Sequence, residues 1–97
     1  MNAINANAAA TIGGKRDGHP TRVAILDRGM RIETAAAFAR QCGGRVLIGG
    51  HQRRRVYLSL PSATRISTLA QWAWENGLIV TMGDAGITLR RRAEEGV

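Results

Sequence analysis

The sequence predicts one α+β domain with the ferredoxin-like order strand, helix, strand, strand, helix, strand, in which two helices cover one face of an antiparallel sheet. Two observations predict it. Apolar residues follow a strand pattern in four short segments and a helical period in two longer ones, and Gly or Pro clusters separate these segments. We expect the domain over residues 21–92, because a chain of 97 residues holds one modest core.

The ends of the chain are expected to lie outside this domain. Residues 1–20 are rich in Asn, Ala and Gly and hold too few large aliphatic side chains to offset the entropy lost on ordering. They are therefore predicted to be a flexible tail. Residues 93–97 are predicted to be a frayed C-terminus.

The first βαβ unit is predicted over residues 21–50. Residues 21–27 are apolar on both faces, as in a central strand. From about Met30 to Cys42 the apolar residues recur on one broad helical face, and Gly43 and Gly44 end the helix. Residues 45–50 form the second strand.

The second half begins with the clearest strand signal. In residues 55–60 the apolar positions alternate with Arg55, Tyr57 and Ser59, which predicts a half-buried strand after a cationic hairpin loop. A helix capped by Ser62 or Thr64 follows to about residue 76. Residues 78–82 form the fourth strand, and residues 87–92 either continue it beyond a bend or form a hairpin partner. The first and third strands are expected in the middle of the sheet.

The charge of the chain limits its partners. Fourteen Lys and Arg residues against seven Asp and Glu give a net charge of +7, and the pI is about 11.5. Such a surface attracts nucleic acid, an acidic protein surface or an anionic membrane. A single cysteine, Cys42, excludes an internal disulfide and fits a reducing compartment. No signal sequence or membrane-spanning run is visible, so we expect a cytoplasmic protein that does not bind membranes.

The open face of the predicted sheet is the first candidate site. Period-two alternation can place cationic side chains there beside Tyr57, joined by the loop arginines at one end. This layout resembles that of RNA-recognition domains, whose basic and aromatic sheet face stacks unpaired bases. Tyr57 could equally pack beside an arginine stem. The candidate nucleic-acid or anion-binding residues are Arg22, Arg45, Arg53, Arg54, Arg55 and Tyr57, with a second cluster at Arg90, Arg91 and Arg92.

The two tryptophans give a different candidate. Trp72 and Trp74 fall on opposite shoulders of the apolar stripe of the second helix, and tryptophan with arginine is typical of protein interfaces. Either ring could instead cover the rim of an alanine-rich core.

No enzymatic reading finds support in the sequence. His19 and His51 lie in non-helical segments without a matching carboxylate or thiol, and the pair Glu94 and Glu95 lies in the frayed end. We therefore expect a non-enzymatic protein with no cofactor, no metal and no small-molecule substrate.

Two functions stay open at this point. The favoured one is a small basic protein that contacts nucleic acid or a nucleoprotein complex through its arginine-rich loop and sheet face. The alternative is a small phage- or plasmid-encoded inhibitor or adaptor that acts by protein contact on host machinery such as CRISPR complexes. A homodimer through an exposed sheet edge is compatible with both.

Overall fold

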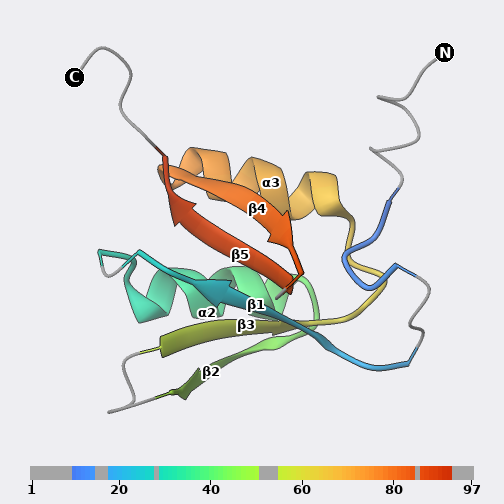
Figure 1. Cartoon of the computed structure of the whole chain (residues 1–97). Helices are drawn as coiled ribbons and strands as arrows, with labels where there is room; N and C mark the ends of the chain where they lie inside the picture. The colour runs from blue at the N-terminus through green and yellow to red at the C-terminus, as the bar shows by residue number, and fades with distance from the viewer. Residues whose placement is uncertain (1–9, 15–17, 28, 51–54, 85, 93–97) are drawn as a thin grey trace, which may run out of the picture.

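The computed structural model describes residues 10–14, 18–27, 29–50, 55–84 and 86–92. Within them the chain forms a five-stranded sheet and two helices (Figure 1). In chain order the elements are β1 (Thr21–Ile25), α2 (Ile32–Gln41), β2 (Arg45–Gly49), β3 (Arg55–Leu60), α3 (Ile66–Glu75), β4 (Leu78–Gly83) and β5 (Gly86–Arg91).

The strands lie in the order β2-β3-β1-β5-β4. Strand β1 runs antiparallel to β3 but parallel to β5, and the remaining neighbours are antiparallel. The predicted α+β domain with central first and third strands is confirmed. The fully antiparallel sheet in ferredoxin-like order is wrong, because the chain turns back after β4 and inserts β5 between β4 and β1 (Figure 1).

Burial explains why β5 is the inner strand of this hairpin. Its residues Ile87 and Leu89 belong to the buried core, whereas in β4 only Leu78 does, and Ile79 and Met82 are 39% and 57% exposed. Burying the β5 pair stabilises the sheet by about 1.5–3 kcal/mol per side chain. The edge strand β4 lacks a neighbour among the described residues on its outer side.

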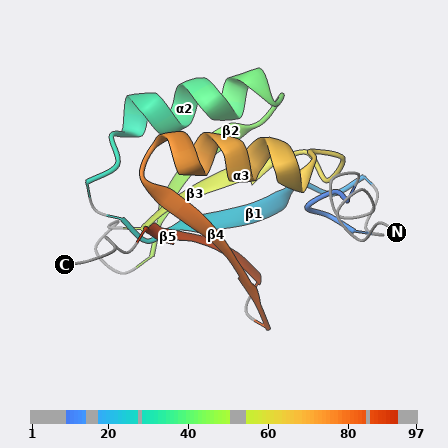
Figure 2. The same cartoon turned by 90° about the horizontal axis from the view of Figure 1, so that it is seen from above.

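Both helices cover the same face of the sheet (Figure 2). Each has ten residues and is followed by a glycine in the left-handed region, Gly43 with φ +87° and Gly77 with φ +76°. No helix in the described part of the chain has the length and apolar character needed to cross a membrane. The core between helices and sheet consists of Ile12, Val23, Ile25, Ala35, Phe38, Ala39, Leu58, Leu60, Leu69, Ala73, Leu78, Ile87 and Leu89.

One residue of the described N-terminal segment, Ile12, belongs to this core. Ile12 is only 7% exposed, and its amide donates to the Thr64 carbonyl at 2.8 Å. Thr11 pairs with Arg65 in an isolated bridge. The flexible tail expected over residues 1–20 therefore does not describe residues 10–14, which pack before the predicted boundary.

The same segment caps α3. Ser62 or Thr64 was expected to cap this helix, and neither does. The N-cap residue is Arg65, and it makes no side-chain capping hydrogen bond. Instead the amide of Ile66 donates to the Ala10 carbonyl at 2.9 Å. A backbone oxygen from a distant segment thus satisfies one of the helix-terminal amides that would otherwise lack a partner.

Candidate nucleic-acid interface

Alternate residues of the five strands form the sheet face opposite the helices, here called the open face. The strand registers decide its membership, because paired residues in neighbouring strands lie on the same side. The open face consists of Arg45, Leu47 and Gly49 of β2, Arg55, Tyr57 and Ser59 of β3, Arg22 and Ala24 of β1, Gly86, Thr88 and Arg90 of β5, and Ile79, Thr81 and Gly83 of β4.

A neutral row crosses the centre of the open face. Tyr57 pairs with Leu47 on one side and Ala24 on the other, and Ala24 pairs with Thr88. These side chains are half-buried. Gly49 lies beside the Tyr57 ring, and a Cβ at this glycine would make an ordinary van der Waals contact of 3.9 Å with the Tyr57 Cε2 atom. The centre is therefore a low platform around one aromatic ring.

Exposed arginines flank this platform on both sides. Arg45 and Arg22 both pair with Ser59 and so occupy one row. Arg55 and Arg90 occupy the row on the opposite side of the platform, and β1 lies between their strands. A 2.8 Å hydrogen bond from the Leu26 amide to the Leu89 carbonyl keeps the chain beside β5 where β1 ends. The two rows lie four residues apart along the strands, about 13 Å.

The charged side chains that the strands place on the open face are all arginines. None of the five strands carries an Asp or Glu, and the described carboxylates, Asp27, Glu33, Glu75 and Asp84, lie on helices or in connections. Within the described residues none of the four arginines forms an ion pair. The Arg22 guanidinium lies 5.7 Å from the centre of the Tyr57 ring, within the range of a cation–π contact.

The C-terminal arginine cluster is divided between two faces. Arg90 joins the open face, while Arg91 pairs with Leu78 and belongs to the opposite side of the strand. Arg92 turns to α3, where its guanidinium lies 4.0 Å from the Trp74 ring centre and donates to the Trp74 carbonyl at 3.1 Å. Arg53 and Arg54 lie outside the described residues, so the loop part of the predicted site has no structural account.

The tryptophans occupy different environments. Trp72 is half-buried and stacks on Phe38, with ring centroids 4.4 Å apart and planes inclined by 8°. Trp74 is 60% exposed beneath Arg92. Trp72 therefore contributes to helix packing, and of the two rings Trp74 is the one that presents a free surface.

Of the residues considered for catalysis, only His19 belongs to the described part of the chain, and Glu94 and Glu95 lie outside it. His19 lies in an exposed segment before β1, and His51 lies outside the described residues. Partial burial raises the pKa of the Cys42 thiol, which lowers its thiolate fraction at neutral pH. Among the described residues no group of three or more His, Cys, Asp or Glu side chains could hold a metal ion.

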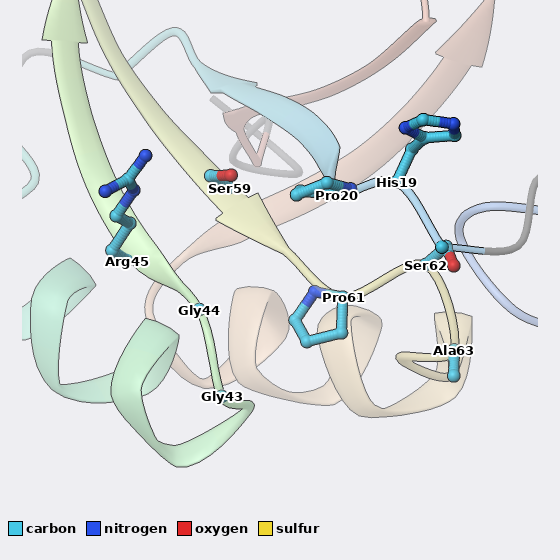
Figure 3. A pocket seen from close by; sticks show the side chains of 10 residues that line it. His19, Pro20, Gly43, Gly44, Arg45, Ser59, Pro61, Ser62 and Ala63 are labelled. Atoms are coloured by element: carbon cyan, nitrogen blue, oxygen red, sulfur yellow. The ribbon is translucent and has the colours of Figure 1, made fainter.

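A pocket adjoins one end of the open face and was not predicted from the sequence. It has a volume of about 530 Å³ and shares Arg45 and Ser59 with the face (Figure 3). Its other lining residues come from the segment before β1, the turn after α2 and the turn after β3. Three segments far apart in sequence form it, so no local pattern could have indicated it.

Comparison of the chain with protein-family models, curated proteins and solved structures gives no match.

Proposed function

We propose that the open face binds single-stranded nucleic acid, free or within a nucleoprotein complex. One observation carries the proposal. Four exposed arginines, Arg22, Arg45, Arg55 and Arg90, surround Tyr57 on a face whose strands contain no carboxylate.

The chemistry of this face suits unpaired bases. A base that is not paired exposes its ring face and can stack on Tyr57, which is worth about 1–3 kcal/mol per stacked base. Arginines on both sides can contact the phosphates that precede and follow that base. The contact between Arg22 and Tyr57 places a cation at the edge of the stacking position.

A paired duplex fits this arrangement less well. Its bases are stacked on one another, so a single ring at the centre of a sheet has no free base face to receive. We therefore expect weaker and more salt-sensitive binding of duplex DNA than of single strands.

The decisive experiment measures fluorescence anisotropy of labelled single-stranded RNA, single-stranded DNA and duplex DNA at low and physiological salt. The test variant is Arg22→Gln/Arg55→Gln, and its control is Arg40→Gln/Arg65→Gln. Both remove two exposed positive charges, but Arg40 lies in the last turn of α2 and Arg65 precedes α3, away from the open face.

If the open face contacts phosphates, the test variant should lower the salt slope of single-strand binding by about 1.4, that is, about 0.7 for each lost contact. The control should leave the slope near that of the wild type. Equal changes in both variants would mean that only the overall charge matters and would contradict the proposal.

A protein partner is the second candidate, and the exposure of Trp74 favours it. A large ring that is 60% exposed beside an arginine has the composition of an interface hot spot. In this reading the chain is an inhibitor or adaptor, of the kind mobile elements direct against host complexes, that meets an acidic surface. Failure of every oligonucleotide to bind, with a partner captured by wild type and lost with Trp74→Ala, would favour it.

A further inference from the structure

The pocket beside the open face has the features of an anion site. It lies where the sheet ends, next to the row formed by Arg45, Ser59 and Arg22. Figure 3 shows Arg45 and His19 on opposite sides of it, with Ser59 between them. Its lining contains no carboxylate.

Two glycines shape the pocket. A Cβ at Gly44 would collide with the carbonyl oxygen of Ser59, so only glycine allows the turn after α2 to approach β3 this closely. Gly43 adopts φ +87°, a conformation that side chains rarely take. The Gly44 amide donates to the Ala39 carbonyl at 2.7 Å, which holds the turn against its own helix.

The remaining lining combines polar and apolar groups. The half-buried hydroxyls of Ser59 and Ser62 are hydrogen-bond donors, and the rings of Pro20 and Pro61 supply apolar walls. A phosphate next to a sugar has matching chemistry, because its oxygens accept hydrogen bonds and its carbon skeleton packs against apolar surface.

We propose that this pocket receives a terminal phosphate monoester of a strand bound on the open face, an inference that rests on the proposed function. A strand that crosses the arginine rows leaves the sheet at this position, so its end reaches the pocket. A terminal monoester carries up to two negative charges near neutral pH, more than an internal diester, and gains more from Arg45 and from donors at His19.

The test compares three oligonucleotides of one sequence: a 5′-phosphorylated form, a 3′-phosphorylated form and one with hydroxyls at both ends. We expect one phosphorylated form to bind wild type about tenfold more tightly than the hydroxyl form, the effect of one charge-assisted contact. The two phosphorylated arms show which end enters the pocket.

The pocket variant is His19→Gln/Ser62→Ala, with Thr68→Ala on the exposed side of α3 as its control. The pocket variant should lose the preference for phosphate while it keeps the wild-type affinity for the hydroxyl oligonucleotide. The control should keep both. Circular dichroism of each variant verifies that the fold is retained.

Each other result overturns the pocket assignment in a recognisable way. Wild type that binds all three oligonucleotides equally rejects the pocket and leaves the open face in place. A preference that survives in a folded pocket variant assigns phosphate recognition to other residues. Wild type that binds no oligonucleotide rejects both proposals.

Discussion

Phe38 of α2 and Trp72 of α3 stack face to face, with ring centroids 4.4 Å apart. This stack joins the two helices on the outer side of the core, and Trp72 also packs against the buried cluster. Trp74, two residues later, lies under Arg92 with most of its ring exposed. Two positions on opposite sides of one helical turn thus carry one structural and one surface tryptophan.

Replacement of the two tryptophans should therefore have unequal effects on stability. Trp72→Ala removes the stack and part of the core cover, and we expect a loss of about 2–4 kcal/mol in the free energy of unfolding. Trp74→Ala removes an exposed cation–π contact worth about 0.5–1 kcal/mol. Urea unfolding of both variants measures the difference, and equal losses would contradict the assignment.

The burial of Ile12 predicts that the N-terminal segment contributes to stability. Ile12→Ala should cost about 2–5 kcal/mol, because it leaves a cavity beneath the turn that precedes α3. Ile32→Ala is the matched control, since Ile32 is exposed at the start of α2, and it should change stability by no more than about 0.5 kcal/mol. Urea midpoints and slopes measure both, and an unaffected Ile12→Ala protein would show that this segment does not support the fold.

Neighbouring arginines of β5 should differ in their effect on nucleic-acid binding. Arg90→Gln removes a charge from the open face, and the salt slope for a single strand should fall by about 0.7. Arg91→Gln removes the same charge from the opposite side of the strand and should leave the slope unchanged. Anisotropy titrations at several salt concentrations compare them, and a reversed order would place the binding surface elsewhere.

Cys42 should make stability depend on alkaline pH. Burial raises the pKa of its thiol in the folded state, so the folded protein holds this proton at pH values where the unfolded chain has released it. The stabilising contribution is complete below the unfolded pKa, about 8.5, and is lost as pH rises toward the folded value. Urea unfolding of wild type and Cys42→Ala between pH 7 and 10 measures this. As pH rises, wild type should lose free energy of unfolding relative to Cys42→Ala, and a difference that stays constant with pH would contradict the prediction.

The secondary structure of the domain could be predicted because its periodicities are clear. The alternation in residues 55–60 and the helical stripes of α2 and α3 match the structure closely. The position of β5 could not be predicted, since the apolar run of β4 reads as an inner strand and the arginines of β5 read as an outer one. Ile12 was missed because a single buried residue in a polar segment produces no period.

The positions of the candidate site residues were predictable only where alternation applies. It places Arg22, Arg45, Arg55 and Tyr57 on one face, as the registers show. The same period-two rule separates Arg90 from Arg91, although the two are neighbours in one arginine cluster of the sequence. The return of Arg92 to Trp74 and the pocket around Arg45 depend on tertiary packing, which no local pattern encodes.

The insertion of β5 between β1 and β4 has a consequence for the order in which the protein can assemble during synthesis. The strand made first and the strand made last among the described elements are direct neighbours. Until Arg91 has emerged from the ribosome, β1 lacks its partner on one side and β4 has no described strand to pair with. The nascent chain can form the β1–β3–β2 half of the sheet early, but only translation through the last strand unites it with the other half.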